Sequence, residues 1–238
     1  MDATCGIVFD LDDTIYPERE YVRSGFEQVA SMLERTCGVR REELSEFLER
    51  LFANGVRGDT FDRLLEAYPR VARWFSVAEV VEAYRTHEPR ISAFPGILKL
   101  LRDLRAAGAR LALLSDGPPA SQRAKFECLQ LHTTFDKAVF TGSLTRRFPK
   151  PGTDGFLAAV QDWHVPPERL TYVGDNPQKD FAAPNQLGWR TVRLRLPVQL
   201  RCEDTAPFEQ YEARIEVRSV AELAAVLRQG SCPDEVKP

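Results

Sequence analysis

The sequence predicts an α/β fold, in which a parallel β-sheet is covered by helices and interrupted by an inserted helical segment. Short apolar runs alternate with longer helical patterns, four of the five runs end in Asp, Ser, Thr or Gly, and one long interval contains no strand pattern. Strands that alternate with helices form βαβ units with a parallel sheet. The 238 residues, 43% of them hydrophobic, suffice for one large core or for a core and a smaller domain.

Five segments have the short, apolar and β-branched composition of buried strands. The expected strands are Cys5–Asp10, Arg110–Ser115, Ala138–Thr141, Leu170–Gly174 and Arg190–Leu196. Helical patterns lie between and after them, and several end at glycine or proline. The expected helices are Pro95–Ala107, Ala120–Leu131, Thr153–Trp163 and a last helix that reaches about Arg228 from the capping box at Ser219 and Glu222.

The long interval after the first strand predicts a separate helical domain. Leu, Phe and Val recur there at steps of three and four residues, which is typical of amphipathic helices. The expected helices of this domain are Tyr21–Arg35, Arg41–Phe52, Phe61–Tyr68 and Val77–Thr86. We therefore expect residues 1–15 and 92–229 to form the core, residues 16–91 to form the inserted domain, and residues 230–238 to be a flexible tail.

The composition excludes several classes of function. A net charge of −3 gives no reason to expect a nucleic-acid partner. No apolar stretch approaches the ~20 residues of a membrane helix, and the first residues lack the pattern of a signal peptide. Five widely spaced cysteines without a CxxC pair indicate reduced thiols rather than disulfides or a zinc site. We expect a cytoplasmic protein.

Asp10 and Asp12 directly follow the apolar run of residues 6–9. Alternate residues of an extended chain share a face, so the two carboxylates can lie on one side together with Thr14. At about 4 Å and an effective dielectric constant near 20, they repel by roughly 4 kcal/mol. A proton or a cation between them would relieve this repulsion. The pair thus favours a hard divalent cation such as magnesium.

Other polar residues follow the remaining expected strands. Ser115, Asp116 and Gly117 end the second strand, the fourth strand leads into the segment from Asp175 to Asp180, and Lys150 lies between two prolines. Functional groups of an open parallel sheet gather outside the carboxyl ends of its strands. Carboxylates for a metal, a hydroxyl group and a cation together suit the binding of a phosphoryl group.

The four strand-end motifs resemble those of the haloacid dehalogenase superfamily. DxDxT is present as Asp10, Asp12 and Thr14, the second motif ends in Ser115, the motif lysine is Lys150, and GDxxxxD supplies Asp175 and Asp180. The resemblance covers the chain outside the inserted helices, whose position matches the cap domain of that family. It implies a Rossmann-like sheet of order 5-4-1-2-3, with a helical cap that opens and closes over its carboxyl edge.

The resemblance also implies roles for these residues. Asp10 would be the nucleophile that forms an aspartyl-phosphate, and Asp12 would first protonate the leaving oxygen and then activate water. For the first step Asp12 must be protonated, so we expect neighbouring carboxylates to raise its pKa. Magnesium would be bound by Asp10, the backbone carbonyl of Asp12 and Asp175, with Asp180 in support. Ser115 and Lys150 would hold the phosphoryl oxygens, helped by backbone N–H groups at Asp116 and Gly117.

The sequence therefore predicts a magnesium-dependent phosphatase that hydrolyses a small phosphorylated metabolite, as a monomer or homodimer with no nucleic-acid or membrane partner. A phosphomutase of the same superfamily is an alternative, because it would share every catalytic residue and differ in how the cap excludes water. Two alternatives from a different functional class are a receiver-like signalling domain and a non-catalytic relative that binds a phosphorylated ligand. The side chains of Asp13 and Asp116 fit a loop-shaping role as well as a functional one.

Overall fold

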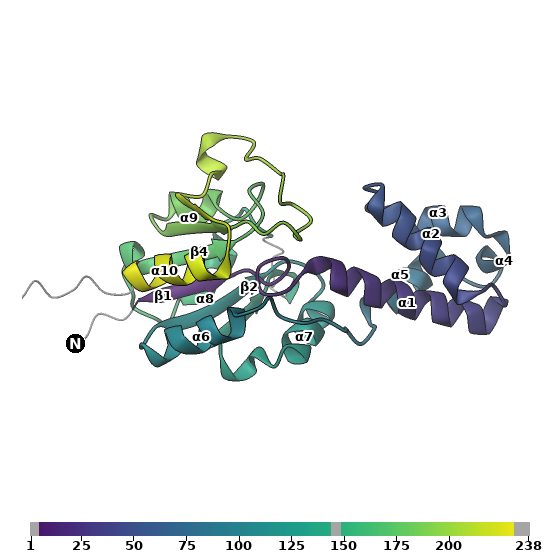
Figure 1. Ribbon diagram of the computed structural model, residues 1–238, viewed down its shortest axis with the longest axis horizontal. Helices are drawn as coiled ribbons and strands as arrows, with labels where there is room; N and C mark the ends of the chain where they lie inside the picture. Colours follow the sequence, from purple (N-terminus) through teal and green to yellow (C-terminus); the bar gives the residue numbers. More distant parts are fainter. Residues whose placement is uncertain (1–4, 144–148, 231–238) are drawn as a thin grey trace, which may run out of the picture. The chain divides into compact units, whose positions relative to one another are not determined.

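A computed structural model of the chain describes residues 5–143 and 149–230 (Figure 1). The chain divides into two compact units, and it passes from the first to the second between Glu18 and Arg19 and back between Ile91 and Ser92. The first unit holds the β-sheet, and the second consists of helices. That the helical unit acts as a substrate-selecting cap stays a prediction. The expected tail from residue 231 onward lies outside the described residues.

The first unit is built on a parallel six-stranded sheet, which confirms the predicted α/β class. The strand order is β3-β2-β1-β4-β5-β6. The strands are β1 (Gly6–Phe9), β2 (Arg110–Ser115), β3 (Lys137–Phe140), β4 (Leu170–Gly174), β5 (Arg190–Leu194) and β6 (Ile215–Val217). The order of the first five agrees with 5-4-1-2-3, whereas β6 was not expected. It has only three residues, with the exposed Glu216 in the middle, and is too short to show a strand pattern.

The register of the central strands brings their carboxyl ends to one edge. Phe9, the last residue of β1, is paired with Leu113 of β2 on one side and with Val173 of β4 on the other. The ladder extends one bond further, because the N–H of Asp10 donates to the carbonyl of Val173 at 2.9 Å. The residues that follow β1, β2 and β4 therefore emerge next to one another.

Helices cover both faces of the sheet, as a parallel sheet requires. Helices α6 and α10 contact each other and lie side by side in Figure 1, and the other face packs its core around Phe156, Tyr172 and Trp189. The helices of this unit are α6 (Ile97–Ala106), α7 (Pro119–Cys128), α8 (Asp154–Val160), α9 (Ala182–Gln186) and α10 (Val220–Gly230). Single 3₁₀ turns occur at Leu131–Thr133, Thr141–Ser143, Pro167–Arg169 and Glu209–Tyr211. Two of the expected helices are shorter than predicted, because α7 ends at Cys128 and α8 at Val160.

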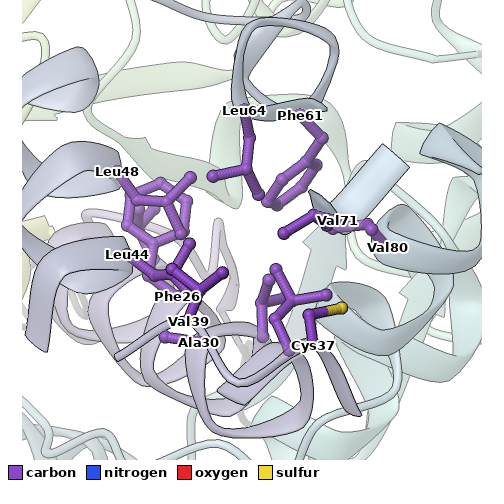
Figure 2. Close-up of a cluster of buried hydrophobic side chains, with 13 residues drawn as sticks. Phe26, Ala30, Cys37, Val39, Leu44, Leu48, Phe61, Leu64, Val71 and Val80 are labelled. Carbon is purple, nitrogen blue, oxygen red and sulfur yellow. The ribbon is translucent and has the colours of Figure 1, made fainter. Parts of the chain in front are cut away.

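The second unit has a hydrophobic core of its own. Its helices are α1 (Glu18–Cys37), α2 (Arg41–Ala53), α3 (Thr60–Ala67), α4 (Pro69–Ala72) and α5 (Val77–Arg85). Side chains from all five helices, among them Phe26, Leu44, Leu64, Val71 and Val80, point into one buried cluster (Figure 2). Four of the five helices were expected. The exception is α4, a single turn that starts at a proline and is too short to show a period.

The composition predicts that the chain has neither a membrane helix nor disulfides. Among residues 5–143 and 149–230, no helix is both long and apolar enough to cross a membrane. Cys37 and Cys202 are free thiols. The fifth cysteine, Cys232, lies outside the described residues.

Candidate active site

The carboxyl edge of the sheet holds a buried lysine surrounded by acceptors. The Lys150 ammonium donates to Asp10 Oδ1 at 2.6 Å, to Asp180 Oδ1 at 2.7 Å and to the hydroxyl oxygen of Tyr172 at 2.9 Å. The Lys150 side chain is 0% exposed. Burial alone would lower its pKa, but Asp10 and Asp180 raise the pKa well above the ordinary value. Lys150 is thus a permanent cation that joins the first and the fourth motif.

Three buried carboxylates beside this lysine form a candidate metal centre. One oxygen from each of Asp10, Asp175 and Asp180 lies within 4.8 Å of the others. Burial and the charges of Asp180 and Asp10 raise the pKa of Asp175 well above its ordinary value, and no described group donates a hydrogen bond to its carboxylate. A hard divalent cation would supply the missing positive charge, and carboxylate oxygens are the ligands it prefers. The residues present therefore fit magnesium.

Asp180 approaches the backbone closely because residue 174 is glycine. A Cβ atom on Gly174 would lie 2.5 Å from Asp180 Oδ2, so any other residue would push the carboxylate away. The same Oδ2 accepts the backbone N–H of Asn176 at 2.9 Å. Burial raises the pKa of Asp180, but Lys150, Lys179 and this N–H outweigh it and lower the pKa. The GDxxxxD spacing thus places the ionised carboxylate of Asp180 in the candidate metal centre.

Asp10 is buried, at 2% exposed, but keeps its charge. Burial raises its pKa to about 6, against the opposing effect of Lys150. The carboxylate is therefore still largely ionised at neutral pH and needs no base to act as a nucleophile. Thr14, the last residue of the first motif, is fully buried, and its hydroxyl has no hydrogen-bond partner within the part of the chain that the structure describes.

Asp12 lies apart from the three clustered carboxylates and faces α7. Lys125 donates to its Oδ1 at 2.7 Å, the Tyr16 hydroxyl donates to the same oxygen, and the Gln122 amide donates to Oδ2 at 3.2 Å. The expectation of a raised pKa for Asp12 is wrong. Burial raises the pKa, but the charge and hydrogen bond of Lys125 and the hydrogen bond of Tyr16 outweigh it and lower the pKa below its ordinary value.

The second motif is held by α7. Ser115 is buried at the end of β2, and its hydroxyl donates to Gln122 Oε1 at 3.1 Å. Gly117 has a φ of +124° and lies so close to Gln122 that an added Cβ would be 2.8 Å from Nε2. Only glycine fits this position without strain. The predicted roles of Ser115, of the backbone N–H groups at Asp116 and Gly117, and of Lys150 in phosphate binding stay predictions.

Asp116 holds the third motif in place. Its Oδ1 accepts the Thr141 hydroxyl at 2.8 Å and the Lys150 backbone N–H at 3.2 Å, and Lys179 Nζ lies 3.8 Å from its Oδ2. These bonds tie β2, the turn after β3 and the lysine loop together. The side chain of Asp116 therefore shapes the loops that present Lys150.

Asp13 fastens the first motif to a loop after β5. Its Oδ1 accepts the Glu18 N–H at 2.8 Å, its Oδ2 accepts the Leu200 N–H at 2.7 Å, and its carbonyl accepts the Gln199 amide at 2.6 Å. Arg193 of β5 joins the same loop to the fourth motif, since its Nε donates to the carbonyl of Asp175 at 3.0 Å and its Nη2 donates to the carbonyl of Arg201 at 2.9 Å. Asp13 adopts a φ of +54°, a left-handed conformation that these bonds stabilise.

Glu18 offers a test of the electrostatics around this loop. Burial and the charges of Asp12 and Asp13 raise its pKa from 4.5 to about 7. The charged form is disfavoured in the folded protein, so this residue costs stability as the pH rises from 4.5 through about 7. Glu18→Gln should remove that loss and raise the free energy of unfolding at the alkaline end by about 1–3 kcal/mol relative to the acid end.

The measurement is urea unfolding of Glu18→Gln and the unaltered protein over this pH range, in the presence of a chelator. Glu66→Gln, on the exposed side of α3, is the matched control and should show no such pH-dependent gain. A gain for Glu18→Gln that is equal at both ends of the range, or larger at the acid end, would contradict the assignment.

Several residues of the site were not identified from the sequence. Tyr16, Gln122, Lys125 and Tyr172 all contact the predicted catalytic side chains. One signal was present, because the chain has only six lysines and three of them, at positions 125, 150 and 179, gather at this edge. A scarce residue type that recurs next to motif positions indicates function rather than a solvated surface.

A parallel sheet that gathers an ionised carboxylate, a buried ammonium and an acidic cluster at its carboxyl edge is typical of a phosphoryl-transfer enzyme. Comparisons with known proteins agree. Residues 6–188 match the family model described as haloacid dehalogenase-like hydrolase. The chain belongs to the haloacid dehalogenase-like hydrolase family, and it is a phosphatase, a phosphoric monoester hydrolase.

Curated relatives and solved structures extend the match over most of the chain. Glyceraldehyde 3-phosphate phosphatase of Methanopyrus kandleri is 29% identical over 233 residues, which cover 92% of this chain and 97% of that protein. The protein of the same name from Methanocaldococcus jannaschii is 27% identical over 197 residues, with 79% and 84% covered. The crystal structure of a HAD phosphatase from Thermococcus onnurineus has the same fold, with a TM-score of 0.61, 23% identity and 94% and 98% covered.

Proposed function

We propose that this phosphatase hydrolyses a small phosphorylated metabolite in the presence of magnesium, through an aspartyl-phosphate on Asp10. The observation that carries the proposal is the position of the Asp10 carboxylate, which is ionised at neutral pH and touches both Lys150 and the cluster formed with Asp175 and Asp180. An anionic nucleophile attacks an anionic phosphate only where positive charge offsets the repulsion. Lys150 supplies part of this positive charge.

Asp10, Asp175 and Asp180 would hold the magnesium ion, together with the backbone carbonyl of Asp12. When bound, the ion would neutralise charge on the phosphoryl oxygens and orient the phosphate. Ser115 and Lys150 would bind the remaining oxygens. Asp12 would transfer a proton to the leaving oxygen and later accept one from the attacking water. The lowered pKa leaves Asp12 ionised before substrate binds, so the proton that it transfers in the first step would come from the phosphate monoanion of the substrate.

The names of the relatives indicate a small substrate. Those that match most of the chain are named as glyceraldehyde 3-phosphate or phosphoglycolate phosphatases, and one that matches 48% of it is named as a phosphoserine phosphatase. All of these substrates are small phosphate monoesters. We therefore propose a substrate of this class. A panel of such esters, assayed for inorganic phosphate with magnesium, tests the proposal, and phosphate release without a bisphosphate activator separates a phosphatase from a phosphomutase.

Asp175 provides a test of the metal centre. Asp175→Asn removes a charged ligand but keeps its shape, so the magnesium concentration for half-maximal activity should rise by at least about tenfold. Activity should disappear with a chelator and return with added magnesium. Titration of phosphate release against magnesium is the measurement, and Asp154→Asn, at the start of α8, is the control. An unchanged magnesium requirement in Asp175→Asn would exclude this residue as a ligand.

A further inference from the structure

Helix α7 turns polar side chains toward the interior of the unit. Its buried residues are Ser121, Gln122 and Lys125, each 4% exposed. Lysine and glutamine are rarely buried unless their polar atoms are paired. A helix whose inward face is polar contributes little hydrophobic stabilisation. The burial of these side chains therefore indicates a role other than core packing.

Two of these side chains hold both oxygens of Asp12. Lys125 Nζ lies 2.7 Å from Oδ1, which also accepts the Tyr16 hydroxyl, and Gln122 Nε2 lies 3.2 Å from Oδ2. A carboxylate oxygen has two lone pairs. Both lone pairs of Oδ1 are therefore occupied, whereas Oδ2 has one longer bond and one acceptor position to which no described residue donates.

Gln122 also connects Asp12 to the second motif. Its Oε1 accepts the Ser115 hydroxyl at 3.1 Å while its Nε2 donates to Asp12. One amide group thus sets the separation between Ser115 and Asp12. The close approach of Gly117, whose added Cβ would lie 2.8 Å from Nε2, leaves the amide little freedom to move.

We propose that Gln122 and Lys125 are positioning residues that orient Asp12 so that Oδ2 is the oxygen that exchanges the proton with substrate and water. The inference rests on the proposed function, whose first step forms the bond between Asp10 and phosphorus. The substrate enters as the phosphate monoanion, whose proton passes to Asp12 Oδ2. As the bond from phosphorus to the leaving oxygen breaks, this proton passes from Oδ2 to that oxygen. In the second step water attacks phosphorus, its proton passes to Oδ2, and the bond to Asp10 breaks.

The dependence of kcat/KM on the leaving group tests this orientation of Asp12. A nitrophenolate departs without protonation, whereas an alkoxide requires it. The value of kcat/KM covers only the steps up to departure of the leaving group, so water attack does not enter it. We would measure kcat/KM for 4-nitrophenyl phosphate and for an alkyl phosphate with Gln122→Met, Lys125→Met, Lys125→Arg and Asp12→Asn.

Both methionine variants should lose at least about 100-fold on the alkyl ester and less than about fivefold on the aryl ester, since general acid catalysis contributes 10²–10⁴-fold. Asp12→Asn should show the same pattern, and Lys125→Arg should recover part of the loss. Arg123→Met removes an exposed cation from the same helix and should lose nothing on either ester.

Equal losses on both esters would overturn the positioning role while the proposed function stands. No phosphate release from any ester by the unaltered protein with magnesium would overturn the proposed function itself. Circular dichroism and thermal unfolding check that the variants are folded. Should Lys125→Met not fold, the uncharged exchange Gln122→Met decides between the outcomes.

Discussion

Asp10→Asn should reduce phosphate release by at least about 10⁴-fold while the protein stays folded. The amide keeps the shape of the carboxylate but has no negative charge with which to attack phosphorus. Lys150 would keep its bonds to Asp180 and Tyr172, so the buried ammonium would remain paired. The fold therefore has no reason to collapse.

The measurement is the initial rate of phosphate release from the best ester of the panel, together with the thermal unfolding midpoint. Asp62→Asn changes an exposed carboxylate of α3 and serves as the matched control, with the rate of the unaltered protein expected. If Asp10→Asn retains a rate within a factor of about ten of the unaltered protein, Asp10 is not the nucleophile.

Lys150→Met should have the largest effect on stability. The ammonium is fully buried between Asp10 and Asp180, so its removal leaves both buried carboxylates without their ion-pair partner. Breaking a buried ion pair on one side costs about 3–5 kcal/mol, because the remaining charge stays desolvated. Phosphate release should also be lost, since Lys150 offsets the charge of the nucleophile and of the phosphate.

Urea unfolding in the presence of a chelator measures this loss, and a second series with magnesium should recover part of it, because a bound cation stabilises the folded state. Lys99→Met removes an exposed lysine paired with Asp103 and should cost at most about 0.5 kcal/mol. Equal stability of Lys150→Met and Lys99→Met would show that the buried cluster is not charged as described.

The sequence predicted those parts of the fold and site that depend on local pattern. Asp10, Ser115 and Asp175 follow apolar runs long enough to be recognised as strands, and the parallel arrangement then places them at one edge. Lys150 was identified through the resemblance of its motif to a known family. The helical unit was predicted from its three- and four-residue periodicity.

The remainder depends on contacts between distant segments. Lys125 is 113 positions from Asp12 in the sequence. The helical periodicity of its segment does not distinguish it from a lysine that faces solvent. The predicted pKa shift of Asp12 had the wrong sign for the same reason, since only nearby carboxylates were visible and the ammonium that outweighs them was not. Strand β6 and helix α4 are too short to show a period.

The most direct test of the central proposal is to trap the phosphorylated enzyme. Steady-state reactions with magnesium and substrate would be quenched with acid and treated with borohydride, which reduces an acyl phosphate of aspartate to homoserine, and the peptides would be analysed by mass spectrometry. We expect homoserine at position 10 in the unaltered protein, and none there without substrate. Unmodified Asp10 during active turnover, or homoserine at another aspartate, would contradict the proposed mechanism.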